Sequence, residues 1–217
     1  MTCDTTKLRE IFDRGLSHGL GRLDSSMCIE AAIAISCGEG FSDRPKCVHT
    51  VDRGFAVQIN DAKWSSPQAR AEALWPLALA QLDTAGKDRS KWVENLVKGI
   101  DENVYNPLMV EVAKTHTELS ECVKSKRVLL DTLDRLYSVD RKPIHKCLRK
   151  IVSSRLYVDS RLYIDARREY DKYNGLGYGL GILVDHMVSL AVQVNNNPDT
   201  ILKAAVQAAL EAYKNDV

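Results

Sequence analysis

Apolar side chains recur at intervals of three and four residues along most of the chain, which is the spacing of one helix face. Near the N-terminus, Leu8, Ile11, Phe12 and Leu16 follow two threonines in this way. The same spacing, together with capping residues and turn residues, predicts helices within residues 27–37, 47–59, 67–82, 89–105, 108–137, 143–173, 176–194 and 200–213. The pattern therefore favours an all-α protein, a multi-helix bundle of about eight helices.

Prolines mark several of the predicted helix boundaries. Ser66 is a suitable N-cap and Pro67 a suitable first helical residue, since proline has no N–H to leave unpaired there. Pro76 is expected to kink the helix that follows, and Pro107 to end the helix over residues 89–105. The tandem segments 155–159 and 161–165 are the only strand candidates. No turn residues separate them, so we interpret them as helix.

The distribution of aromatic residues favours two subdomains. All three tryptophans precede residue 93, and all eight tyrosines follow residue 104. We therefore expect a compact helical subdomain over residues 1–86 and a subdomain of longer antiparallel helices over residues 87–217. One continuous core across both halves is the alternative.

Charge and hydropathy exclude several classes of protein. The chain has 30 Lys or Arg and 29 Asp or Glu, so a globally basic nucleic-acid binder is not expected, although a local nucleic-acid contact stays open. No apolar run reaches the ~18 residues that a membrane span needs, and the N-terminal segment is charged. We expect a cytoplasmic protein without a membrane segment.

The six cysteines are scattered along the chain, and in a reducing compartment free thiols are the default. The alternative is a zinc site made by Cys28, Cys37, Cys47 and His49. These residues lack the closely spaced cysteine pair that organises structural zinc sites. No metal and no cofactor are therefore predicted.

Glu30 is the only charged residue between Met27 and Cys37. A carboxylate on such an apolar helix needs a partner from another helix, and Arg53 and Arg70 are the candidates. A buried structural ion pair is one interpretation. The other is that Glu30 lines a polar pocket and contacts a ligand.

Two polar loops are candidate ligand contacts. Residues 19–26 join two glycines, a guanidinium and two hydroxyls ahead of the predicted helix at 27–37, with Asp24 or Ser25 as its N-cap. This composition suits an anion site as well as a plain turn. Residues 60–66 place an indole beside amide and carboxylate groups. The candidate contacts are Arg22, Ser25 and Ser26 for phosphate, Trp64 for stacking, and Asn60 and Asp61 for the edges of a base or ribose.

A basic segment lies in the second half of the chain. Residues 141–168 hold nine Lys or Arg against two Asp, interleaved with tyrosines. This segment could face phosphates or an acidic protein, or be a solvated helix face neutralised by nearby aspartates. Its candidate contacts with an anionic partner are Arg149, Arg155, Arg161 and Arg168.

Five short motifs stand out between residues 15 and 85: CIEAA at 28–32, DRPKCV at 43–48, NDAKWSS at 60–66, ARA at 69–71 and AQL at 80–82. Together they resemble an uncharacterised group of hypothetical proteins from bacteriophages and bacterial mobile elements. The resemblance implies an accessory phage protein. Such proteins often act on host defence, either by blocking a protein or by sequestering a nucleotide signal.

These observations lead to one functional hypothesis and two alternatives. The hypothesis is a non-enzymatic binding protein that sequesters a phosphorylated small molecule, such as a nucleotide-derived signal, to counter host defence. The first alternative is an inhibitor that covers an acidic host protein with its basic helix face, and the second is a nucleotide-cleaving enzyme. The common hydrolase motifs are absent from the sequence, so no catalytic residue is predicted. A homo-oligomer is compatible with either binding mode.

Overall fold

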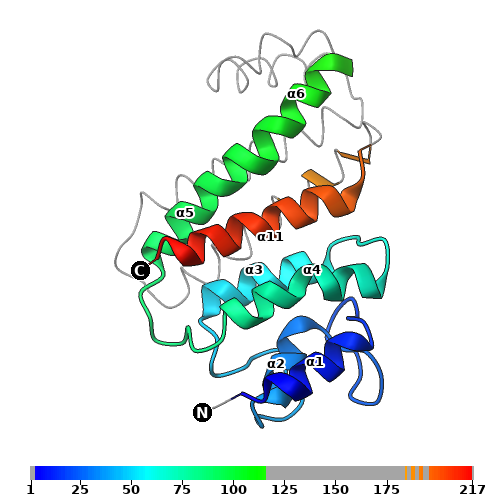
Figure 1. Cartoon of the computed structure of the whole chain (residues 1–217), viewed down its shortest axis with the longest axis vertical. Helices are drawn as coiled ribbons and strands as arrows, with labels where there is room; N and C mark the ends of the chain where they lie inside the picture. The colour runs from blue at the N-terminus through cyan, green and yellow to red at the C-terminus, as the bar shows by residue number, and fades with distance from the viewer. Residues whose placement is uncertain (1–2, 116–183, 185–186, 189–190, 193–195, 217) are drawn as a thin grey trace, which may run out of the picture.

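The computed structural model describes residues 3–115, 184, 187–188, 191–192 and 196–216. Within these residues every regular element is a helix, and the only β-type pairing is one isolated antiparallel bridge between Gly21 and Met27. The predicted all-α class is confirmed for this part of the chain (Figure 1). None of the helices in it combines the length and apolar character needed to cross a bilayer.

Four helices make up the N-terminal part of the fold. They are α1 (Thr5–Asp13), α2 (Ile29–Ser36), α3 (Thr50–Asp61) and α4 (Pro67–Ala80). The Ser66 hydroxyl accepts the backbone N–H of Ala69 at 3.0 Å, so the predicted start of α4 is confirmed. The helix continues through Pro76, whose side chain is exposed.

The next helix corrects one prediction. We expected a break before Pro107, but α5 (Ser90–Ile100) passes through a π-helical segment, η1 (Asp101–Tyr105), directly into α6 (Asn106–Thr115). In an α-helix the proline ring would clash with the carbonyl four residues earlier. The wider π-turn, in which Asn106 N–H bonds to Asp101 O, adds a residue just before the ring and lets the helix continue.

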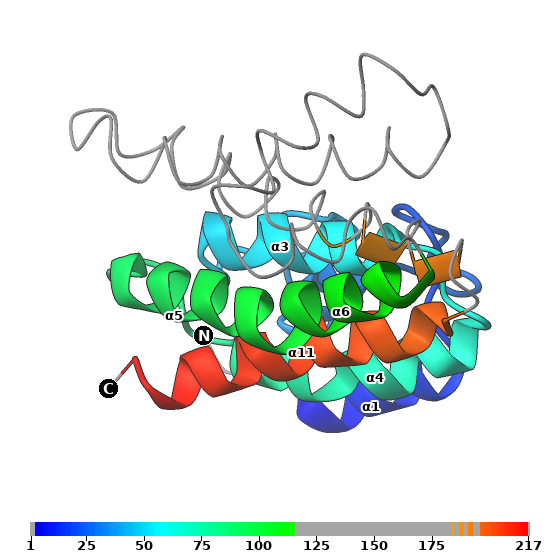
Figure 2. The same cartoon turned by 90° about the horizontal axis from the view of Figure 1, so that it is seen from above.

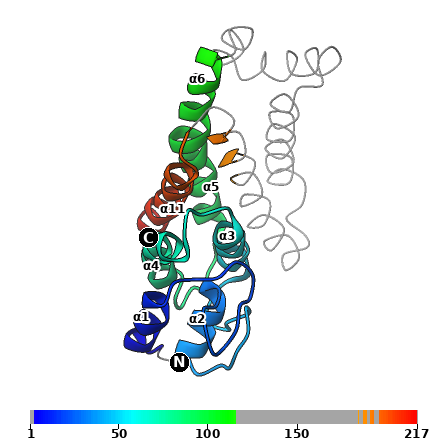
Figure 3. The ribbon, with the colours of Figure 1, turned by 90° about the vertical axis from the view of Figure 1, so that its right-hand side faces the viewer.

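The last helix, α11 (Pro198–Lys214), packs against α5, η1 and α4. It begins at Pro198, capped by the Asn197 side chain, two residues earlier than predicted. Figures 1 and 2 show α11 running antiparallel to α5 and lying between the α5–η1–α6 rod and α4. Figure 3 shows α1 and α2 at one end of this arrangement and α6 at the other.

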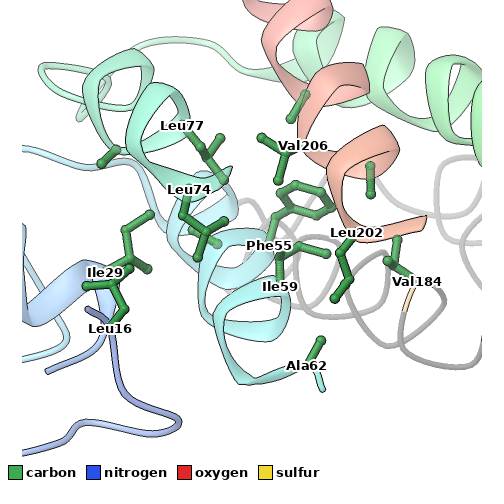
Figure 4. Close-up of a cluster of buried hydrophobic side chains, with 14 of the residues drawn as sticks. Leu16, Ile29, Phe55, Ile59, Ala62, Leu74, Leu77, Val184, Leu202 and Val206 are labelled. Atoms are coloured by element: carbon green, nitrogen blue, oxygen red, sulfur yellow. The ribbon is translucent and has the colours of Figure 1, made fainter. Parts of the chain in front are cut away.

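One hydrophobic core extends through the described helices. Phe55 and Ile59 on α3 point toward α11, while Leu74 and Leu77 of α4 close the other side (Figure 4). Phe55, Ile59 and Leu74 are fully buried. This core includes residues on both sides of the predicted boundary at residue 86. The division into two subdomains stays a prediction, because most of the second half lies outside the described residues.

Helices α5 and α11 approach closely at Gly99. A Cβ built on this glycine would lie 3.0 Å from the Cβ of Ala208, which is tighter than ordinary packing. The buried alanines of α11 permit this approach: Ala205, Ala208, Ala209 and Ala212.

We therefore expect Gly99→Leu to destabilise the protein by about 1–3 kcal/mol, because overpacking forces the two helices apart. Urea denaturation followed by circular dichroism measures the effect. Lys98→Leu, at the adjacent exposed position of α5, is the matched control and should change stability little. Equal stability of the two variants would contradict close packing at Gly99.

Candidate functional site

A buried ion pair connects three helices at the core. Arg89, directly ahead of α5, donates from Nη2 to Asp52 Oδ1 at 2.9 Å and from Nε to Asp52 Oδ2 at 3.1 Å. Both side chains are almost completely buried, at 2% and 0% exposure. Arg89 also bonds to Asp216 beyond α11, and the Tyr213 hydroxyl donates to Asp52. The Arg89 guanidinium thus ties α3 to the start of α5 and to the end of α11.

Two aromatic rings flank this guanidinium. Its central carbon lies 4.9 Å from the ring centre of Trp92 and 4.7 Å from that of Tyr213. Such cation–π contacts favour a desolvated arginine over a lysine. We call Asp52, Arg89, Trp92, Tyr213 and Asp216 the Arg89 network.

Burial dominates the electrostatics of the network. Desolvation raises the pKa of Asp52, although Arg89 and the Tyr213 hydroxyl oppose the rise. Burial and the Asp52 charge together raise the pKa of Tyr213 well above its ordinary value. Burial lowers the pKa of His49, whose Nδ1 lies 3.8 Å from Asp52. The hydrogen-bond capacity of Asp52 is used internally, which indicates a structural role for the network.

Glu30 is fully buried on α2, as its apolar surroundings suggested. Desolvation raises its pKa to about 8, and Gln81 and Arg53 oppose this rise. Neither carboxylate oxygen of Glu30 makes a well-aligned hydrogen bond, and the side-chain amide of Gln81 makes no such bond either. Of the two expected cations, Arg53 lowers the pKa of Glu30 through its charge. Arg70 instead donates from Nη1 to Leu16 O at 2.7 Å.

Asn60 and Asp61 hold the polar loop that precedes α2. Asn60 Nδ2 donates to Ser17 O at 2.9 Å, and its Oδ1 accepts the Ile29 N–H at 3.2 Å. Asp61 Oδ1 accepts the Gly19 N–H at 2.7 Å. The two residues expected to contact a base or ribose therefore position residues 17–29 of their own chain.

Trp64 does not lie on the surface. Its indole is 7% exposed, and Nε1 donates to Ile59 O at 2.8 Å. An aromatic ring beside polar residues can pin a loop to a core as readily as it can stack on a ligand. In this structure, Trp64 pins its loop to the core.

Arg22, Ser25 and Ser26 remain together on one loop. The Arg22 N–H bonds to Ser26 O at 3.0 Å, and the Ser25 N–H to Arg22 O at 3.3 Å. The Arg22 guanidinium makes a two-point ion pair with Asp24, at 3.0 and 2.9 Å, and both side chains are exposed. Any anion bound at Arg22 would compete with Asp24.

The N-cap expected at Asp24 or Ser25 is wrong. Cys28 is the N-cap of α2, and its Sγ accepts the Ala31 N–H at 3.4 Å. The reason is the Gly21–Met27 bridge, which closes the loop on itself before the helix begins. With Asn60 on the Ile29 N–H, this cap occupies two of the N–H groups that an anion would need.

The cysteines also depart from the expectation of free thiols. Cys3 and Cys37 form a disulfide, and the Cys47 sulfur lies 3.5 Å from that of Cys37. The zinc alternative placed Cys37 and Cys47 in one site, and their sulfurs do lie close together. However, Cys28 caps the opposite end of α2, and His49 Nδ1 accepts the Val51 N–H. The wide spacing of Cys3 and Cys37 in the sequence gave no sign of their pairing.

Sequence reasoning missed Asp52 as a site residue, although a signal was present. It lies three and seven residues before Phe55 and Ile59, so it shares their apolar face. A lone carboxylate on such a face requires a buried cation. No comparable apolar pattern surrounds Arg89 in the sequence, so nothing marked it as the partner.

The four arginines expected to contact an anionic partner, Arg149, Arg155, Arg161 and Arg168, lie outside the described residues.

Comparison with known proteins adds no match to this geometry. No protein-family model, curated protein or solved structure matches the chain. The resemblance of residues 15–85 to phage and mobile-element proteins stays a prediction.

We expect Arg89→Met to destabilise the fold by about 3–5 kcal/mol, because it leaves Asp52 buried without its cation. Arg9→Met is the matched control. Arg9 pairs with Asp13 at 2.8 Å and lies 5.0 Å from the Trp75 ring, but on the surface, so its loss should cost less than about 1 kcal/mol. Urea denaturation compares the two, and equal losses would exclude a special role for Arg89.

Glu30 should make stability dependent on pH. Its pKa is raised from 4.5 to about 8, so between these pH values the folded chain keeps a proton that the unfolded chain releases. Stability should therefore fall as pH rises through this range, by at most about 1.4 kcal/mol per pH unit.

Glu30→Gln mimics the protonated side chain and should remove this dependence, making the variant more stable than the wild type at pH 8 and similar to it at pH 4.5. Denaturation midpoints across the range measure the difference. Glu72→Gln, at an exposed position of α4, is the control that should leave the wild-type profile intact.

Proposed function

We propose that the protein is a non-enzymatic binding protein that recognises a partner protein through residues 17–28, named here the recognition loop. The observation that carries this proposal is the exposure of two leucines on a loop with a fixed backbone. Leu20 is 41% exposed and Leu23 is 58% exposed. Exposed leucines on an ordered loop can serve as apolar anchors for a partner protein.

Contacts at both ends fix the recognition loop. Asp61 accepts the Gly19 N–H and Asn60 donates to Ser17 O, so α3 anchors the first turn. Across the loop, the Cys28 N–H bonds to Leu20 O at 3.2 Å. A loop ordered before binding loses little conformational entropy when a partner docks, which favours affinity.

Gly21 is required for this loop conformation. Its φ is +76°, and an added Cβ would lie 2.4 Å from Ser26 O and 2.6 Å from Met27 Cα. These are backbone atoms and cannot move aside. The two sides of the loop can therefore approach closely at the Gly21–Met27 bridge only because residue 21 is glycine.

The exposed side chains indicate the chemistry of the partner. Leu23 lies between Arg22 and Asp24 in the sequence, and Leu20 lies two residues before Arg22, so the loop offers apolar contacts beside both signs of charge. A protein surface with an apolar centre and a mixed polar rim complements this arrangement. The resemblance to phage proteins suggests a bacterial host protein as the partner.

A phosphorylated small molecule is the second candidate ligand. Arg22, Ser25 and Ser26 share the same loop, which favours this candidate. The exposed position of Arg22 leaves its guanidinium open to phosphate oxygens, provided that phosphate displaces Asp24.

Photocrosslinking from position 23 tests the protein partner. A benzophenone amino acid replaces Leu23, and the labelled protein is irradiated in a bacterial extract with an excess of unlabelled competitor. Wild-type protein and Leu79→Ser, a control at a leucine of α4 that is 37% exposed, should both compete away the crosslink. The double variant Leu20→Ser/Leu23→Ser should compete at least tenfold less well, since a few residues of an interface carry most of its binding energy and these two are the exposed apolar residues of the loop.

Equal competition by the double variant would contradict recognition through the loop. Titration calorimetry with linear and cyclic nucleotides tests the second candidate, a phosphorylated small molecule. Micromolar binding of a nucleotide that is lost in Arg22→Ala would favour a phosphorylated ligand over a partner protein. Recovery of a cleaved nucleotide after incubation would contradict a non-enzymatic role.

A further inference from the structure

Three cysteine sulfurs gather where the N-terminal segment meets the connection between α2 and α3. Cys3 precedes α1, Cys37 follows α2, and Cys47 lies in the turn before α3. The Cys47 sulfur is 3.9 Å from that of Cys3 and 3.5 Å from that of Cys37. All three sulfurs lie within 4.8 Å of one another. We call these residues the three-cysteine cluster.

The spacing of these sulfurs suits a thiolate-bound metal ion. Zinc–sulfur bonds of about 2.3 Å in a tetrahedral site place neighbouring sulfurs about 3.8 Å apart. The two separations that involve Cys47 are already close to this value. Only Cys3 and Cys37 must move apart when their disulfide is reduced. Both residues lie outside the helices, where the backbone can adjust.

The charges around the cluster favour a cation. Cys37 is the C-cap of α2, so the partial negative charge of that helix end faces the cluster. Glu39 lies close enough to raise the pKa of the Cys47 thiol. Its Oε2 accepts the Lys46 N–H, but its buried Oε1 has no hydrogen-bond partner. A cation at the cluster would be stabilised by this carboxylate.

We propose that the three-cysteine cluster, when reduced, binds one thiophilic divalent cation of the Zn²⁺ type through Cys3, Cys37 and Cys47. A dithiol reductant first transfers two electrons and two protons to the Cys3–Cys37 disulfide and becomes a disulfide itself. The cation then replaces the three thiol protons, giving three metal–sulfur bonds and releasing three protons. Water fills the fourth position. Metal binding and the disulfide are therefore alternative states of one site.

Cobalt is the spectroscopic probe for this site. The experiment uses the full chain with Cys122→Ser and Cys147→Ser, so that these two cysteines cannot bind the probe. After reduction by a dithiol and removal of the reductant without oxygen, Co²⁺ should give one equivalent of thiolate-to-cobalt charge-transfer absorption. Zn²⁺ should displace it. The oxidised protein should give no such absorption.

Two further variants locate the binding site. Cys47→Ser retains the residues of the disulfide, so its fold can be checked in the oxidised state, and it should bind Zn²⁺ at least about 100-fold more weakly. Cys28→Ser is the matched control, since Cys28 is buried at the other end of α2 and should bind as the parent does. Absence of the cobalt band in the reduced parent would overturn the proposal. An undiminished band in Cys47→Ser would overturn it too.

Discussion

The bidentate pair between Arg89 and Asp52 is the interaction on which the described fold depends most. It holds a carboxylate of α3 and a guanidinium at the start of α5 in the buried interior, where each charge would be costly alone. The same guanidinium also pairs with Asp216, and the Tyr213 hydroxyl donates to Asp52, so both partners retain the end of α11. Helices distant in the sequence are thus joined at one polar point within an apolar core.

The helices of this structure could largely be predicted, because their signals are local. Apolar spacing and the Ser66–Pro67 start of α4 depend on neighbouring residues only. The π-turn before Pro107 could not be foreseen, since it is one of several ways to accommodate a proline. Glu30 stood out because its helix offers no polar face, but the sequence left open whether it forms a buried ion pair or lines a pocket; the structure shows it fully buried.

The candidate site was less predictable because its contacts join distant residues. Asn60, Asp61 and Trp64 have side chains suited to a ligand, yet the structure uses them to anchor loops. The disulfide of Cys3 with Cys37 depends on how α1 packs against α2, which no local pattern encodes. Polar motifs in a sequence therefore indicate where hydrogen bonds form, and tertiary packing decides whether the partner is internal or external.

The central claim is that buried polar contacts hold a rigid scaffold that presents residues 17–28 in one conformation. Hydrogen exchange of the wild-type protein tests it most directly at the amides of Gly19, Arg22 and Cys28, which bond to Asp61, Ser26 and Leu20. The account predicts that these amides exchange as slowly as the core amides of α3. Exchange at the rate of an unstructured peptide would contradict it.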